Sequence, residues 1–202
     1  MTDLGSSVVE WRGSTRLDAP LVVLMHGWGE SETDMMALVP SLPADLAYAS
    51  VRGPYLRGRH FAWFDTGRSF DDTVRWFESW LDGVAPAGRP VVLVGFSAGA
   101  AFAGGVLLLN PSRYAGTAIL YGTLPFDAGV PTPLGGLLGA NVFVAHSSDD
   151  GMIQGELLKR AWTYLTEESG ARVQAVRLKG GHGVSEEVLA ELSRWISEVA
   201  LS

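Results

Sequence analysis

Apolar runs of strand length alternate with stretches of helical periodicity along almost the whole chain. The runs predict strands over residues 8–11, 21–25, 46–51, 90–94, 117–121, 142–145 and 173–178. The periodic stretches predict helices over residues 32–42, 71–84, 100–109, 154–169 and 185–200, the last capped by Ser185. Continuous apolar strands that alternate with helices favour an α/β fold, in which a mostly parallel sheet is covered by helices on both faces.

Polar and glycine-containing clusters follow the predicted strands. Two longer loops are also expected: residues 55–69 are rich in glycine, arginine and aromatic residues, and residues 122–139 are rich in proline and glycine. Active sites of open parallel sheets form beyond the carboxyl ends of the strands. The clusters therefore predict a single site at that edge, with residues 122–139 as the one segment that could act as a flap.

Gly95-Phe96-Ser97-Ala98-Gly99 lies between a predicted strand and a helix of small residues. Gly-x-Ser-x-Gly at a strand-to-helix turn indicates a nucleophilic serine. Larger side chains two positions before or after Ser97 would collide in so sharp a turn, and the helix N–H groups favour a developing negative charge there. The alternative is a turn of small residues that only packs a helix tightly against a strand.

A serine nucleophile needs a base, and the base needs an orienting carboxylate. Chain order in hydrolases of this type is Ser, then Asp, then His, which matches Ser97, the pair Asp149 and Asp150, and His182. We favour Asp150 as the acid and Asp149 as a turn or helix-start residue. The alternatives are a solvated Asx turn for the acidic pair and a surface-loop histidine for His182.

Two backbone N–H groups are needed to stabilise the oxyanion. Ala98, directly after Ser97, is one expected donor, and Trp28 in the His26-Gly27-Trp28-Gly29 stretch is the other. The alternative for this stretch is an ordinary strand-to-helix turn. We also expect His26, which precedes the turn, to organise it through hydrogen bonds.

Aromatic residues gather in the loops at the expected site. We expect an apolar acyl or aryl group to contact Trp28, Phe61, Trp63, Phe126 and Met152. For each aromatic residue singly, sealing the edge of the core is the competing interpretation. The remaining tryptophans lie on predicted strands or helices and are expected in the core: Trp11, Trp76, Trp80, Trp162 and Trp195.

Composition narrows the class of protein. A chain of 202 residues with 47% hydrophobic residues predicts one domain over residues 1–202, and the net charge of -7 without a basic run argues against a nucleic-acid partner. Cysteine is absent, and no histidine pair has metal-binding helical spacing, so we expect no metal and no cofactor. Neither a signal peptide nor a membrane span is expected, which favours a cytoplasmic enzyme. The oligomeric state stays open, with a homodimer as one alternative.

Four motifs in chain order resemble the α/β-hydrolase superfamily, and within it the small phospholipase/carboxylesterase family that includes acyl-protein thioesterases. They are Leu-Met-His-Gly-Trp-Gly at 24–29, Arg-Gly-Pro at 52–54 with Trp-Phe-Asp at 63–65, Gly-Phe-Ser-Ala-Gly at 95–99, and His-Ser-Ser-Asp-Asp at 146–150 with Gly-His at 181–182. The resemblance implies an α/β-hydrolase fold without a large lid, a triad of Ser97, Asp150 and His182, and oxyanion donors at Trp28 and Ala98.

Two positions depart from that family's usual pattern: Gly151 follows Asp150 where proline is usual, and Glu30 follows Gly29 where aspartate is usual. Both departures weaken the assignment of the chain to this subfamily more than they weaken the assignment of the triad residues. The expected function is a serine hydrolase acting on short to medium acyl or aryl esters, or on thioesters. The alternatives are an acyltransferase or perhydrolase that uses the same acyl-enzyme, and a non-catalytic small-molecule-binding protein on the hydrolase fold.

Overall fold

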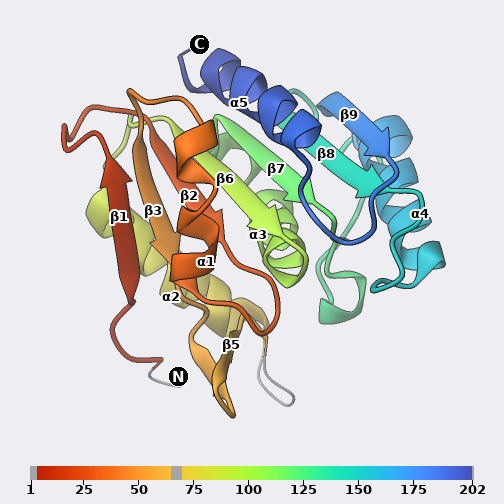
Figure 1. Cartoon of the computed structure of the whole chain (residues 1–202), viewed down its shortest axis with the longest axis horizontal. Coiled ribbons are helices and arrows are strands. Elements are labelled where there is room, and N and C mark those ends of the chain that lie inside the picture. Colours follow the sequence, from red (N-terminus) through yellow and green to blue (C-terminus); the bar gives the residue numbers. More distant parts are fainter. Residues whose placement is uncertain (1–3, 65–69, 202) are drawn as a thin grey trace.

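The computed structural model describes residues 4–64 and 70–201. Asp65 of the Trp-Phe-Asp motif and the end of the loop expected over residues 55–69 lie outside the described residues. A seven-stranded sheet forms the centre of the molecule, in the order β1-β3-β2-β6-β7-β8-β9 (Figure 1). Its strands are β1 (Val9–Gly13), β2 (Leu21–Met25), β3 (Ala47–Val51), β6 (Val91–Phe96), β7 (Gly116–Leu120), β8 (Asn141–Ser147) and β9 (Arg172–Leu178).

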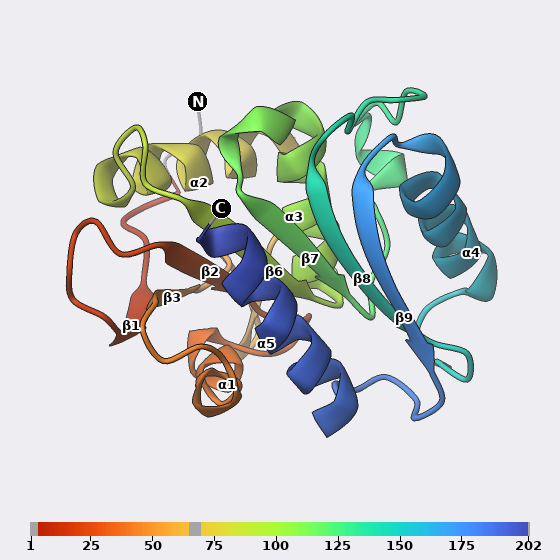
Figure 2. The same cartoon turned by 90° about the horizontal axis from the view of Figure 1, so that it is seen from above.

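All neighbouring strands are parallel except β1, which pairs antiparallel with β3 at the edge of the sheet. Helices cover both faces (Figure 2): α1 (Glu32–Met36) and α5 (Glu186–Ala200) lie on one side, and α2 (Phe70–Val84), α3 (Ala98–Leu109) and α4 (Gly155–Thr163) on the other. The apolar pattern predicts this mostly parallel α/β arrangement, and the resemblance implies the α/β-hydrolase fold; among the described residues no large lid covers the sheet.

Alternate residues of the central strands feed two separate apolar clusters, one on each face. Val23 and Leu93 pack with Phe77 of α2 and Phe102 of α3. Val22 and Leu24 pack on the other face with residues of α1 and α5. Because both faces are covered, every residue of β2 is fully buried.

The predicted helix over residues 32–42 is shorter than expected. It ends as α1 at Met36, and a separate 3-10 helix, η1 (Val39–Ser41), follows. Pro40 lies inside η1, and because proline has no N–H it cannot continue an α-helix. The helix predicted over residues 154–169 is α4, continued by a π-helical turn, η4 (Tyr164–Glu168).

The segment predicted as a loop over residues 55–69 begins with a small hairpin of β4 (Tyr55–Arg57) and β5 (His60–Ala62). Two further 3-10 helices are η2 (Pro111–Arg113) and η3 (Phe126–Ala128), the latter within the long loop after β7.

The core prediction for Trp11 is wrong: its side chain is about half exposed on the edge strand, and its ring contacts Trp80.

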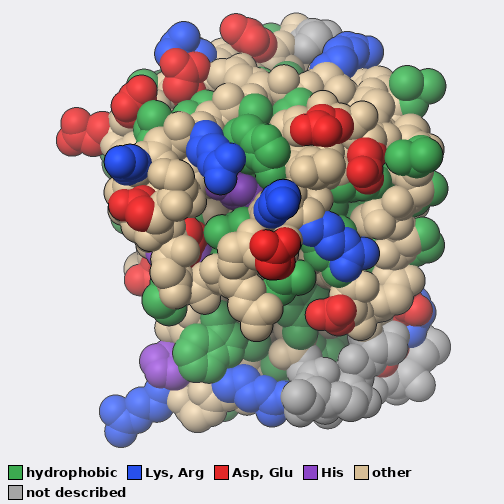
Figure 3. Space-filling view, turned by 90° about the vertical axis from the view of Figure 1, so that its right-hand side faces the viewer, with side chains coloured by type: hydrophobic (Ala, Val, Ile, Leu, Met, Phe, Trp, Pro, Cys, Tyr) green, Lys and Arg blue, Asp and Glu red, His purple; other side chains and the backbone are tan. Residues whose placement is uncertain are grey.

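The face of the molecule over α4 and β9 carries basic and acidic side chains interspersed among apolar ones (Figure 3). Within the described ranges, no helix is long and apolar enough to cross a membrane.

Candidate active site

Ser97 occupies the turn between β6 and α3 in a conformation that few residues adopt. Its φ is 55° and its ψ is -113°, and its N–H donates to the carbonyl of Leu120 on β7 at 2.9 Å. Glycine is required on both sides: a Cβ on Gly95 would lie 2.3 Å from the carbonyl oxygen of Gly99, and one on Gly99 would lie 2.2 Å from that of Met25. The turn holds the serine backbone strained at the head of α3.

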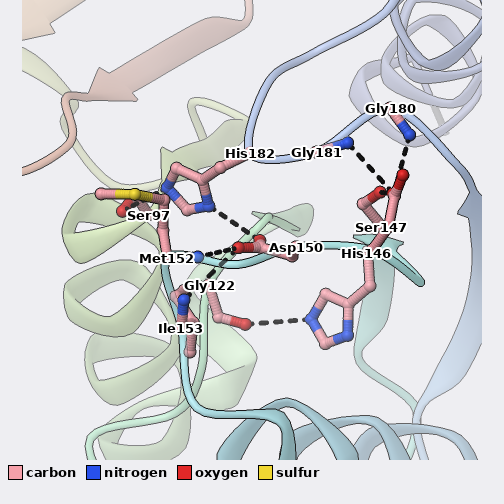
Figure 4. Close-up of polar contacts among 11 residues, drawn as sticks. Ser97, Gly122, His146, Ser147, Asp150, Met152, Ile153, Gly180, Gly181 and His182 are labelled. Atoms are coloured by element: carbon pink, nitrogen blue, oxygen red, sulfur yellow. Dashed lines mark hydrogen bonds and ion pairs between the residues drawn. The ribbon is translucent and has the colours of Figure 1, made fainter.

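A continuous line of hydrogen bonds joins Ser97, His182 and Asp150 (Figure 4). The Oγ atom of Ser97 lies 2.9 Å from Nε2 of His182. Nδ1 of His182 donates to Oδ2 of Asp150 at 2.7 Å, which leaves Nε2 as the acceptor for the serine hydroxyl. The geometry lets Ser97 lose its proton to His182 while Asp150 fixes the tautomer and orientation of the ring.

Asp150 is kept ionised in a buried place. Its side chain has no exposed surface, and burial on its own raises the pKa of the carboxyl. Hydrogen bonds from His182 and from the N–H groups of Met152 and Ile153 outweigh burial, so the pKa lies below its usual value. The bond from Met152 is the Asx turn weighed as the alternative for this pair, and it coexists with the bond to His182.

Two aromatic rings hold the imidazole of His182 from its sides. The Phe96 ring centroid lies 5.2 Å from that of His182, and the Tyr121 ring meets it edge-on at 6.4 Å. Tyr121 has a φ of 49°, which lies in the left-handed region. A residue other than glycine adopts this region only at a cost in free energy. A strained tyrosine directly beside the base is a feature that the sequence pattern does not reveal.

The loop after β2 is braced by a buried network around His26. Gly53 donates its N–H to Nε2 of His26 at 2.9 Å, Nδ1 donates to the carbonyl of Gly27 at 2.7 Å, and the Trp63 indole donates to the carbonyl of His26 at 2.8 Å. The prediction that His26 organises this turn is confirmed. Glu32 and Arg52 form a half-buried ion pair beside it, with 2.7 Å between Nε of Arg52 and Oε2 of Glu32.

The two predicted oxyanion donors lie in suitable surroundings. Glu30 accepts the N–H of Gly27 at 2.7 Å, so the glutamate that replaces the usual aspartate caps this turn. For the N–H groups of Trp28 and Ala98, no hydrogen-bond acceptor occurs in the part of the chain that the structure describes. Ala98 begins α3, where a helix offers unpaired N–H groups to an anion.

A cleft of about 480 Å³ is lined in part by Ala101 and Thr123, from two segments that also contact Ser97. Ala101 lies one turn along α3 from Ser97, and Thr123 follows Gly122, which packs directly on the carbonyl of Ser97. These two segments connect Ser97 to the cleft, whose walls expose nearly as much polar as apolar surface. The cleft is lined by Phe64, Phe70, Ala101, Thr123, Leu124, Pro125, Phe126, Asp127, Ala128 and Leu157.

The residues predicted to contact substrate are placed differently from one another. Phe126 lines the cleft, with the Arg160 guanidinium 3.8 Å from its ring centroid. Trp28 and Met152 are largely exposed, and Phe61 is half-buried beneath Arg52. The expectation for Trp63 is wrong: its side chain is fully buried and stacks on Phe102 at 4.7 Å, so it contacts the core and not a ligand.

Sequence reasoning also missed the contacts of Asp149, next to the triad. Asp149, expected only in a turn, accepts hydrogen bonds from the N–H groups of Gly180 and Gly181, which precede His182.

No group of three or more His, Asp or Glu side chains that could hold a metal ion occurs within residues 4–64 and 70–201.

Comparisons with known proteins bear on the family and on the fold. A family model described as Phospholipase/Carboxylesterase matches residues 67–200. The structure of the Bacillus cereus carboxylesterase superposes with a TM-score of 0.80 at 20% identity, covering 96% of this chain and 94% of that one. The structure of a Mesorhizobium loti carboxylesterase superposes with a TM-score of 0.75 at 23% identity, covering 88% of each chain. A phospholipase/carboxylesterase from Dyadobacter fermentans superposes with a TM-score of 0.72 at 19% identity, covering 94% of this chain and 95% of that one. No curated protein sequence matches the chain.

Proposed function

The chain belongs to the phospholipase/carboxylesterase family, and we propose that it is a serine hydrolase that cleaves carboxylic esters through an acyl-enzyme on Ser97. The observation that carries the proposal is the pair of hydrogen bonds that link Ser97 to His182 and His182 to Asp150. Solved carboxylesterases with the same fold support ester hydrolysis as the reaction class.

In the proposed reaction, His182 takes the Ser97 proton at Nε2 as Oγ attacks the acyl carbon, and Asp150 stabilises the imidazolium that forms. The N–H groups of Trp28 and Ala98 bind the oxyanion of the tetrahedral intermediate. The bond to the leaving alcohol or thiol then breaks, and the leaving group departs with the proton from His182. Water attacks the acyl-enzyme by the same route and releases the acid.

We assign the acyl group to the cleft that starts at Ala101. Its volume suits a short to medium acyl chain or an aryl group, which the side chains of Phe70, Leu124 and Phe126 in its walls can contact. The chemistry needs no cofactor, because nucleophile, base and electrostatic stabilisation all come from protein groups.

Hydrolysis of a p-nitrophenyl ester series from acetate to dodecanoate tests the proposal. We expect the wild-type protein to turn over, and Ser97→Ala to lose about 10⁶-fold in kcat because the nucleophile is gone. A serine-directed phosphonate should label wild-type Ser97 with one equivalent and leave the variant unlabelled.

An active Ser97→Ala variant would show that another residue is the nucleophile. A wild-type protein that is labelled but hydrolyses neither esters nor thioesters would favour acyl transfer to a different acceptor, and product analysis with added alcohols or peroxide identifies that case. Failure of both labelling and turnover would favour a non-catalytic binding protein.

A further inference from the structure

The loop that carries His182 has little packing of its own. Gly180 and Gly181 have φ values of 147° and 70°, and a Cβ placed on Gly180, Gly181 or Gly183 would meet no atom within 4 Å. Glycine residues in open space leave the backbone many conformations, so the loop's own side chains do not fix the backbone on either side of His182.

One carboxylate oxygen holds this loop. Oδ1 of Asp149 accepts the N–H of Gly180 at 2.9 Å and that of Gly181 at 3.1 Å, and it also accepts the Oγ–H of Ser147 at 2.5 Å. In Figure 4 the dashed lines from Gly180 and Gly181 meet at one side chain beside Ser147, at the end of β8. The hydrogen bond from Ser147 comes first among the causes that hold the pKa of Asp149 well below its usual value, followed by those from the two glycines.

We propose that Asp149 is a positioning residue for the reaction proposed above: it fixes the loop so that His182 stays within reach of Ser97. The adjacent carboxylates then have separate tasks. Asp150 binds the ring of His182, and Asp149 binds the backbone that precedes it. Both project from the turn that ends β8, so one rigid element sets the orientation and the position of the base.

Asp149→Ala tests this directly. We expect kcat for p-nitrophenyl esters to fall about 10²-fold, since a misplacement of about 1 Å in a catalytic group has an effect of that size. KM should change little, because Asp149 does not line the cleft. Asp149→Asn keeps an acceptor oxygen in place of Oδ1 and should restore kcat to within about tenfold of wild type, since neutral hydrogen bonds are about half as strong as charge-assisted ones.

A readout that does not depend on turnover is the low-field proton NMR resonance of the His182 Nδ1–H, assigned by its loss in His182→Gln. We expect this resonance in the wild-type protein and in Asp149→Asn, and a weakened or absent one in Asp149→Ala. Asp45→Ala is the matched control: it removes an exposed carboxylate just before β3, at the opposite end of the sheet, and should leave both readouts unchanged.

Wild-type kcat and an unchanged resonance in Asp149→Ala would overturn the inference, and so would a fall in kcat that Asp149→Asn does not restore. Ser147→Ala serves if Asp149→Ala does not fold: it removes one of the three bonds and should lower kcat severalfold, and an unchanged kcat would overturn the inference. A wild-type protein that shows the resonance but hydrolyses no ester would contradict the proposed function alone.

Discussion

The length of acyl chain that the proposed cleft accepts should depend on single side chains of two segments. Ala101 lies on the first turns of α3, and Phe126 lies on η3 with Arg160 against its ring. Neither residue takes part in the hydrogen bonds of the triad. Changes at these positions should therefore alter which acyl chain fits and leave the chemistry unchanged.

Ala101→Leu adds three carbon atoms to the cleft and should shift the preferred p-nitrophenyl ester toward acetate, lowering kcat/KM for octanoate about 10- to 100-fold, as expected for one to two buried methylene contacts. Phe126→Ala enlarges the cleft and should shift the preference toward longer chains. The two profiles are compared with that of the wild-type protein. Identical chain-length profiles in all three proteins would mean that the acyl group binds elsewhere.

At the scale of elements, the close approach of α3 to β2 depends on Gly99. A Cβ there would lie 2.2 Å from the carbonyl oxygen of Met25 and 2.6 Å from that of His26, both backbone atoms that cannot turn aside. We expect Gly99→Ala to lower the free energy of unfolding by about 2–3 kcal/mol through overpacking, as measured by urea denaturation.

Gly83→Ala near the end of α2 is the matched control, because a Cβ there would meet nothing within 4 Å. It should raise the free energy of unfolding by about 0.5–1 kcal/mol, since alanine restricts the unfolded chain. Equal effects of the two substitutions would refute the close-packing argument.

Periodicity predicted the elements with apolar faces, and the exceptions have local causes. The strands of the central sheet lie near their predicted residues, because long apolar runs have no other way to be buried. The β4–β5 hairpin was missed since its strands are short, although Gly58-Arg59 is a two-residue turn of the Gly-x type. The exposure of Trp11 follows from its place on an edge strand, which the apolar pattern does not reveal.

The residues of the candidate triad were predictable from motifs, whereas the hydrogen bonds that position the loop around His182 were not. Gly-x-Ser-x-Gly and the chain order of acid and histidine single out the residues of the hydrogen-bonded triad. The bonds from Gly180 and Gly181 to Asp149 join segments about thirty residues apart through backbone atoms, and backbone donors leave no trace in residue identity.

For the whole molecule, two buried histidines predict how stability depends on pH. His26 and His146 are almost without exposed surface, and burial lowers the pKa of each. The carbonyl and carboxylate groups nearby only partly offset this: Gly27 and Glu30 near His26 raise its pKa, and Gly122 and Asp150 do so for His146. The positive charge of Arg177 lowers the pKa of His146 further.

Because the unfolded chain takes up these protons first, the free energy of unfolding should fall as the pH drops below about 6.5, by at most about 1.4 kcal/mol per pH unit for each histidine. Below about pH 4 the loss should steepen, since the lowered pKa values of Asp149, Asp150 and Glu32 make their ionised forms stabilising only above that range. Urea denaturation from pH 8 to pH 5 measures the first effect, and His146→Gln should reduce its slope. Greater stability at pH 5 than at pH 7 would contradict the assignment.

The strained backbone of Ser97 has a practical consequence for finding the ester that the proposed reaction would cleave. Glycine at position 97 removes a strain of about 1–3 kcal/mol and costs about 0.5–1 kcal/mol in unfolded-chain entropy, so Ser97→Gly should be at least as stable as the native chain. The same change deletes the proposed nucleophile and leaves the cleft intact. Immobilised and exposed to a cell extract, such a chain would retain the uncleaved ester as a substrate trap, and mass spectrometry of the eluate would identify the molecule.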